Sequence, residues 1–120
     1  MASWRFEAIG TQWEIETTDA LTDSARAAVT AEIDRFDREW SRFRADSDVG
    51  RLGREGGSFA SVDARPMLDA YRELSRATGG AANPLVADSL VALGYDADYS
   101  LVAGDPVRAP AAWEQDVSWT

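Results

Sequence analysis

The chain has 120 residues, of which 12 are basic and 21 are acidic, so 12 − 21 gives a net charge of −9. A chain of this length builds one core at most, which predicts a single domain over residues 1–120 or the N-terminal part of a larger domain. The 45% hydrophobic fraction is typical of a folded protein, and no apolar stretch is long enough for membrane insertion. The acidic charge repels phosphate backbones, so nucleic-acid binding is not expected.

Missing residue types narrow the chemistry further. The chain contains no Cys and no His, which excludes thiol nucleophiles, disulfides and imidazole acid-base catalysis. Every basic residue is Arg, so a phosphate-binding loop lysine and Schiff-base chemistry are excluded as well. The first residues contain neither a secretory apolar segment nor a lipidation Cys, which predicts a cytoplasmic location.

The first half of the chain predicts strands followed by helices. Residues 4–17 alternate between apolar and polar, which indicates two short strands or one strand bent at Gly10. Apolar residues from Ala25 to Phe43 then recur at spacings of three and four, which predicts a helix whose N-terminus Thr22 or Asp23 can cap. A short helix is expected from Asp46 through Leu52, ended by glycines at positions 53, 56 and 57.

The second half predicts further short elements. Residues 59–62 read as a strand, and Asp63 is expected to cap a third helix that Gly79 and Gly80 end. Asn83-Pro84 predicts a corner before a fourth helix that runs to Gly94. Residues 95–101 read as irregular, 103–112 as a surface loop and 114–120 as a strand. Trp113 and Trp119 are expected to need a partner surface from outside the chain. This order predicts an α+β fold with strands and helices packed in layers.

The segment Trp40-Ser41-Arg42-Phe43-Arg44-Ala45-Asp46-Ser47-Asp48 is the first candidate site. In one interpretation it is a helix end followed by a new N-cap, with Phe43 in the core. In the other, the aromatic ring stacks on a planar heterocycle while guanidinium groups fork onto phosphate oxygens. The sequence alone leaves both interpretations open.

The segment Thr78-Gly79-Gly80-Ala81-Ala82-Asn83-Pro84-Leu85 is the second candidate site. Its small residues allow a ligand to approach the backbone closely, and the helix that follows offers free amides to an anion. Equally, a glycine C-cap followed by an asparagine N-cap explains every residue of the segment.

Two acidic clusters, at residues 46–50 and 96–100, begin like calcium-binding loops. Neither has glycine at the required position, and neither has the acidic residue that ends such a loop. We therefore assign no metal ligands to residues 1–120.

In this order, the pieces resemble the N-terminal part of the FAD:protein FMN transferase family, also called ApbE-like proteins. Ala8-Ile9-Gly10-Thr11 resembles the family's Ala-Met-Gly-Thr strand opening. Trp40-Ser41-Arg42-Phe43 with Asp46-Ser47 resembles its Ser-x-(Phe/Tyr)…Ser segment. Thr78-Gly79-Gly80-Ala81-Ala82-Asn83-Pro84 resembles its Thr-Gly-Gly-Ala-Phe-Asp-Pro corner.

The resemblance implies a transferase that moves FMN from its substrate FAD to a Thr or Ser hydroxyl of a target protein, releasing AMP with the help of Mg²⁺. It places five residues of this chain at FAD-contacting positions: Ile9, Phe43, Ala81, Ala82 and Asn83. Ala82 replaces a phenylalanine and thereby loses a stacking ring, whereas Asn83 replaces an aspartate and thereby loses a charge.

The family's lysine-containing stretch and its metal-binding region have no counterpart in this lysine-free sequence. We expect the catalytic groups to lie beyond residue 120, in a missing C-terminal half or a second chain, and the 120-residue span alone to be inactive. Two alternatives stay open. One is a flavin-binding module without catalytic activity, and the other is an acidic interaction domain.

Overall fold

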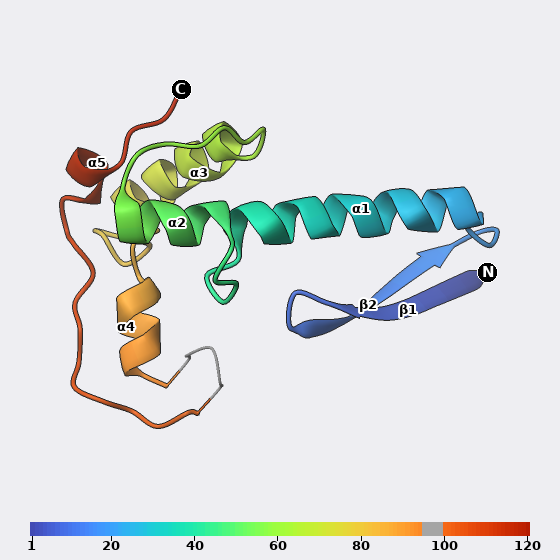
Figure 1. Cartoon of the computed structure of the whole chain (residues 1–120), viewed down its shortest axis with the longest axis horizontal. Helices are drawn as coiled ribbons and strands as arrows, with labels where there is room; N and C mark the ends of the chain where they lie inside the picture. Colours follow the sequence, from blue (N-terminus) through green and yellow to red (C-terminus); the bar gives the residue numbers. More distant parts are fainter. Residues whose placement is uncertain (95–99) are drawn as a thin grey trace. The chain divides into compact units, whose positions relative to one another are not determined.

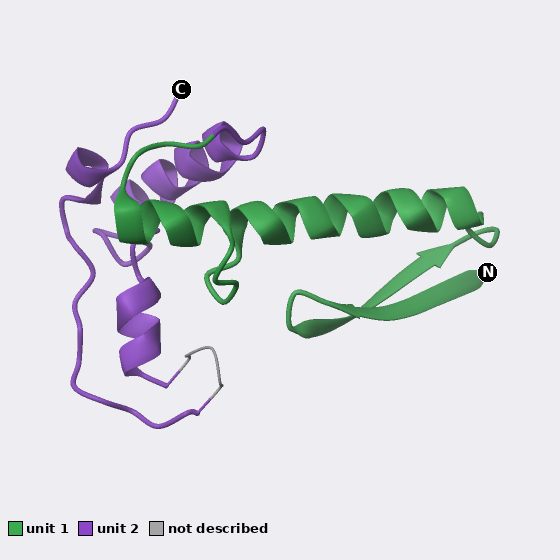
Figure 2. Cartoon of the chain, viewed as in Figure 1, with its two compact units in different colours: residues 1–59 green, residues 60–120 purple. Residues whose placement is uncertain are grey.

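A computed structural model describes residues 1–94 and 100–120, which form two compact units, Met1–Phe59 and Ala60–Thr120 (Figure 2). The predicted irregular stretch around Tyr95 and the second acidic cluster lie largely outside the described residues. Figure 1 shows the elements in chain order: β1 (Ala2–Ala8), β2 (Thr11–Thr17), α1 (Asp23–Trp40), α2 (Asp48–Glu55), α3 (Ala64–Ala77), α4 (Ala87–Ala92) and α5 (Trp113–Asp116).

Strands β1 and β2 form an antiparallel hairpin, which confirms the prediction of two strands. The register sets Trp4 opposite Ile15 and Phe6 opposite Trp13, so these four side chains share one face of the pleated pair. The rings of Phe6 and Trp13 stack at 6.2 Å. An apolar face of this kind is what a two-stranded sheet presents to a packing helix.

Helix α1 begins where predicted, because the Thr22 hydroxyl accepts a hydrogen bond from the Ala25 N–H at 3.1 Å. It ends at Trp40, since Ser41 adopts an extended backbone conformation. The predicted apolar stripe continued to Phe43, and this part of the prediction is wrong because Phe43 lies in the loop after the helix. Within unit Met1–Phe59 no apolar side chain is buried.

Helix α2 begins at Asp48, two positions later than predicted, because Ser47 is its N-cap. The Ser47 hydroxyl is fully buried and accepts a hydrogen bond from the Gly50 N–H at 3.0 Å. Gly53 lies inside the helix, and Gly56, at a φ of 69°, ends it. The prediction of a strand over residues 59–62 is wrong, because these residues pair with neither β1 nor β2. Instead the Phe59 ring packs edge-on against Trp40 at 5.0 Å, and Val62 is 81% exposed.

Helix α3 follows Asp63, but the Asp63 side chain does not cap it, since the backbone of Asp63 is already helical. Helix α4 starts later than predicted, at Ala87, because Pro84 and Leu85 form a turn of their own. Residues 103–110 carry neither helix nor strand.

The C-terminal segment corrects the prediction of a strand over residues 114–120. Trp113 starts the short helix α5, is only 2% exposed and donates its indole N–H to the Ser75 hydroxyl at 3.3 Å. Trp119 stacks on Trp113 at 5.7 Å and donates its indole N–H to Asp69 at 2.8 Å. Helix α3 therefore supplies the partner surface that we expected from outside the chain, because its polar groups satisfy both indoles.

Candidate functional site

The tip of the β1–β2 hairpin contains the first residue of the predicted flavin site. Ile9 and Gly10 connect the strands, and both have positive φ angles, 45° and 75°. Positive φ at both central residues defines the turn that best matches the twist of a hairpin. Ile9 is 49% exposed, and the Trp13 indole N–H donates to the Ala8 carbonyl at 3.1 Å beside it. A β-branched, partly exposed side chain therefore occupies a strained backbone position.

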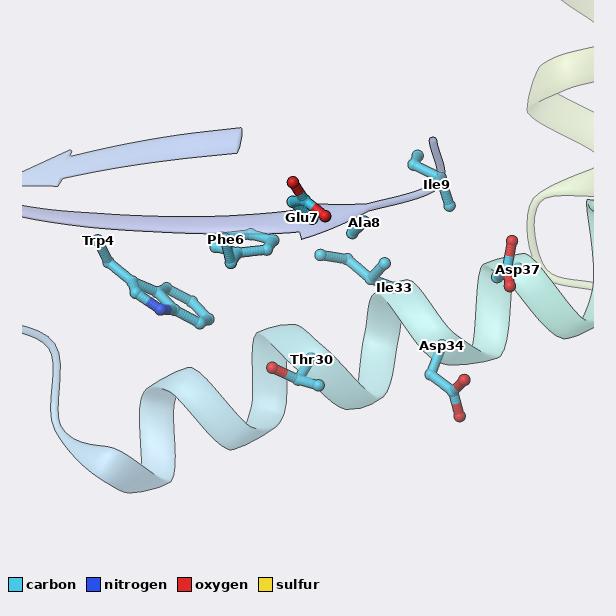
Figure 3. Close-up of a pocket in the computed structure, with 9 residues that line it drawn as sticks. All are labelled: Trp4, Phe6, Glu7, Ala8, Ile9, Thr30, Ile33, Asp34 and Asp37. Atoms are coloured by element: carbon cyan, nitrogen blue, oxygen red, sulfur yellow. The ribbon is translucent and has the colours of Figure 1, made fainter. Parts of the chain in front are cut away.

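A cavity of about 340 Å³ lies between β1 and α1 in unit Met1–Phe59. Figure 3 shows Trp4 and Phe6 of β1 on one side of it and Ile33 of α1 on the other. Ile9 is part of its lining, as are the α1 carboxylates Asp34 and Asp37. Phe43 is not part of the lining, so of the predicted site residues in this unit the cavity includes Ile9.

Phe43 lies in the loop between α1 and α2 and is 39% exposed. The Ser41 hydroxyl accepts a hydrogen bond from the Phe43 N–H at 3.3 Å, which fixes the backbone at this point. The Arg42 guanidinium lies over the Phe43 ring, 4.0 Å from the ring centre. The loop thus presents an arginine over the face of a partly exposed aromatic ring.

Arg44, in contrast, is engaged by carboxylates. It forms a two-pronged contact with Asp46, at 2.9 and 3.0 Å, and lies 3.3 Å from Asp37 and 3.8 Å from Asp34. The hydrogen bonds from Arg44 hold the pKa of the Asp46 carboxyl below its usual value. Hydrogen bonding to Asp46 in turn raises the pKa of Arg44. Arg44 therefore anchors the loop to α1 and has no free fork for a phosphate.

The corner between α3 and α4 contains the remaining predicted site residues. Gly79 and Gly80 have φ angles of 62° and 90° and end α3. The Thr78 hydroxyl closes the corner, because it donates to the Leu74 carbonyl at 2.6 Å and accepts from the Ala82 N–H at 3.1 Å. Sequence reasoning assigned no role to Thr78, although its place directly before two glycines is typical of a helix end.

Asn83 has a structural role at this corner. Its side-chain oxygen accepts from the Leu85 N–H at 2.8 Å, and its side-chain nitrogen donates to the Pro110 carbonyl at 2.8 Å. Asn83 is 7% exposed, whereas Ala81 is exposed and Ala82 half-buried. Aspartate could not donate to Pro110, so this contact gives a physical reason for asparagine at this position.

The five predicted site residues are divided between the two units. Ile9 and Phe43 belong to residues 1–59, and the consecutive residues 81–83 belong to residues 60–120. Within residues 1–94 and 100–120, no three side chains of the metal-ligating types come together in a group that could hold a metal ion. In the same ranges, no helix is both long and apolar enough to cross a membrane.

The chain is thus an α+β protein with an arginine-aromatic loop and a Thr-Gly-Gly corner. The sequence pattern of the ApbE family matches residues 9–116, and the chain belongs to this family. No curated protein matches the chain. The solved structure "Flavin Transferase ApbE from Vibrio cholerae" is similar to it, with a TM-score of 0.65 and 16% sequence identity.

That likeness covers 96% of this chain and 38% of the Vibrio cholerae chain. At this level of identity it shows the fold alone, and it confirms the predicted α+β class as part of an ApbE-like fold. The chain thus spans well under half the length of the structure that it matches.

Proposed function

We propose that this chain is the N-terminal portion of a flavin transferase, which moves FMN from FAD to a Thr or Ser hydroxyl of a target protein. The match to the ApbE family over residues 9–116 carries the proposal, and the fold likeness to a flavin transferase supports it. Because the chain spans 38% of that structure, the activity is proposed for a protein in which a C-terminal half or a second chain completes the fold.

In the proposed reaction, the hydroxyl oxygen of the target attacks the phosphorus of the FMN half of FAD. A new oxygen–phosphorus bond forms, the bond to the bridging oxygen breaks, and AMP leaves with that oxygen while the hydroxyl proton passes to a base. Such a reaction depends mainly on positioning and on neutralising phosphate charge. The contribution that we propose for this chain is a set of FAD contacts, at Ile9 and Phe43 in one unit and at Ala81, Ala82 and Asn83 in the other.

The described residues do not fit a magnesium site. They contain no group of three metal-ligating side chains, and the two-pronged contact with Arg44 occupies the carboxylate of Asp46. Hard cations of this kind are bound through oxygen ligands, and carboxylates neutralised by arginine are poor ones. We therefore assign no step of the reaction to a metal held by this chain.

The test is an assay for AMP release from FAD in the presence of Mg²⁺ and a Thr-containing target peptide. We expect AMP release from the completed protein and none from the 120-residue chain. Phe43→Ala should weaken FAD binding, because it removes the exposed ring, whereas Tyr71→Ala on α3 removes a similarly exposed ring at an unrelated place and serves as the control. A completed protein that binds FAD but releases no AMP would exclude the transferase.

Such a result would favour a second candidate, a flavin-binding module without catalytic activity. Ala82 and Asn83 motivate this candidate, because they depart from the phenylalanine and the aspartate of the family's corner. Stable FAD binding without AMP release would identify the module, and failure to bind FAD would exclude it.

A further inference from the structure

The loop between α1 and α2 contains two arginines in opposite electrostatic situations. Arg44 lies within 4 Å of three carboxylates. Arg42 forms no ion pair with any residue in the described part of the chain, and its guanidinium lies 4.0 Å above the Phe43 ring. Since Asp46, the nearest acidic residue along the loop, is bound to Arg44, the loop itself does not neutralise Arg42.

The chain has twelve arginines and a net charge of −9. Among the described residues, three other arginines also lack an ion pair. Two of them have a different environment, because Arg26 lies over the Trp4 ring with its Nε buried, and Arg54 donates to the Ala45 carbonyl. Arg108 belongs to the loop before α5, in the other unit. Arg42 thus differs from the other three, because its guanidinium lacks an ion pair and lies over the Phe43 ring, which is 39% exposed.

We propose that Arg42 binds a phosphate group of a nucleotide whose planar ring system lies at Phe43. A guanidinium that contacts a ring through its face keeps N–H groups at its edges, and these can form two parallel hydrogen bonds with phosphate oxygens. The proposal rests on the proposed function, because it names the residue that recognises phosphate at the same flavin-nucleotide site. Both halves of FAD carry a phosphate, and the ligands chosen for the test distinguish them.

The test is an NMR titration of the full 120-residue chain with three ligands: ADP, FMN and riboflavin, the last of which has no phosphate. The signals to follow are the Arg42 side-chain N–H and the Phe43 ring protons. Arg42→Gln removes the guanidinium, and Arg42→Lys keeps the charge without the planar fork. Arg108→Gln is the matched control, since it removes one positive charge from another arginine that lacks an ion pair.

We expect ADP or FMN to shift both signals in a saturable way, and Arg42→Gln to weaken that binding about tenfold or more, as loss of hydrogen bonds to a charged group should. Arg42→Lys should recover part of the affinity, and Arg108→Gln should match the unmodified chain. If FMN is the ligand that responds, riboflavin should bind the unmodified chain and Arg42→Gln equally, because riboflavin has no phosphate. A response to ADP alone would assign the AMP half of FAD to Arg42, and a response to FMN alone would assign the flavin half.

Two results would overturn the proposal: no shift with either phosphate ligand, or equal weakening by Arg42→Gln and Arg108→Gln. Failure of the proposed function looks different. If ADP or FMN binding depends on Arg42 but the completed protein releases no AMP, the phosphate site at Arg42 stands and the transferase is excluded. If riboflavin binds and Arg42→Gln does not weaken the binding of ADP or FMN, the flavin site stands and phosphate binding by Arg42 is excluded.

Discussion

Ile9 occupies a backbone conformation that disfavours its own side chain. Its φ of 45° lies in the left-handed region, where a β-branched residue is strained by about 1–3 kcal/mol. We predict that Ile9→Asn, which creates the Asn-Gly sequence favoured in such turns, raises the free energy of unfolding by about 1 kcal/mol. Chemical denaturation measures this gain.

The same variant tests whether the strain serves binding. If Ile9 contacts FAD as proposed, Ile9→Asn should stabilise the chain and at the same time weaken FAD binding in the completed protein. Thr11→Ser, one position beyond the turn, is the control and should change neither quantity. Unchanged FAD affinity would mean that Ile9 is only a hairpin residue.

Arg44 and Asp46 make the stability of the loop depend on pH. The pKa of Asp46 is lowered from 3.8, chiefly by hydrogen bonds from Arg44. A carboxyl with a lowered native pKa stabilises the fold fully above its unfolded pKa of 3.8, and that stabilisation disappears as the pH falls through the native pKa. NMR titration of Asp46 should therefore give a midpoint below 3.8.

Arg44→Gln should return that midpoint toward 3.8, whereas Arg5→Gln, in the hairpin, should leave it in place. A midpoint for the unmodified chain at or above 3.8 would show that the pair does not form in solution.

Asn83 can be tested by a substitution that restores the residue type of the family. Asn83→Asp removes the donor to the Pro110 carbonyl and puts a carboxylate at a position that is 7% exposed. We predict a loss of about 1–3 kcal/mol in the free energy of unfolding at neutral pH. The loss should shrink in acid, because a protonated carboxyl can again donate to Pro110.

Gln115→Glu, the same chemical change at an exposed position, is the control for Asn83→Asp and should cost much less. Equal losses for the two variants at every pH would contradict the role of the contact with Pro110.

At the scale of single elements, the features that the sequence predicted are those that depend on neighbouring residues. The hydroxyl caps at Thr22 and Ser47 and the glycine end of α3 involve partners within a few positions. The strand predicted for residues 59–62 failed because a strand needs a partner, which no local pattern reveals.

The candidate site likewise contains some features that neighbouring residues determine and others that depend on distant segments. The Thr-Gly-Gly corner was predictable from its composition. The bond from Asn83 to Pro110 spans 27 positions, and the contrast between Arg42 and Arg44 depends on carboxylates of α1. Local sequence reasoning could not have found either, because both arise from the way in which separate segments pack.

Helix α2 contains two glycines for which the same substitution should have opposite effects. A Cβ at Gly50 would lie 2.8 Å from the Ser47 hydroxyl oxygen and 3.3 Å from the Arg44 carbonyl, whereas a Cβ at Gly53 would meet nothing within 4 Å. We predict that Gly53→Ala stabilises the chain by about 0.5–1 kcal/mol, as alanine does in a helix interior. Gly50→Ala should destabilise it, because it disturbs the cap of α2.

Thermal denaturation of the two variants provides the comparison for α2, and each variant is the control for the other. Stabilisation by both substitutions would mean that the Ser47 cap does not hold α2 in solution.

The whole molecule leaves much of its apolar surface accessible. Trp113 is the only large apolar side chain that is buried among the described residues. Trp13 is 37% exposed and Phe43 is 39% exposed, although both are large aromatic residues. The net charge of −9 opposes association of such surfaces between molecules. It does not supply the stabilisation that buried apolar side chains give to a fold. This pattern agrees with a chain that spans 38% of the fold that it matches.

The hairpin should respond most to completion of the fold. Its sheet has two strands in the described part of the chain, so the outer edges of both strands carry backbone groups without a strand partner. A two-stranded sheet is marginally stable unless further strands or helices cover it. We predict that amide hydrogens of residues 2–17 exchange rapidly in the 120-residue chain and much more slowly in a longer protein that completes the fold.

Hydrogen exchange followed by mass spectrometry compares the two proteins segment by segment. The part of α3 around Ser75, which Trp113 covers in the chain itself, is the internal control and should change far less between them. Equal protection of residues 2–17 in both proteins would show that packing against α1 is enough to stabilise the hairpin. In that case, the accessible apolar face would be a property of the finished protein.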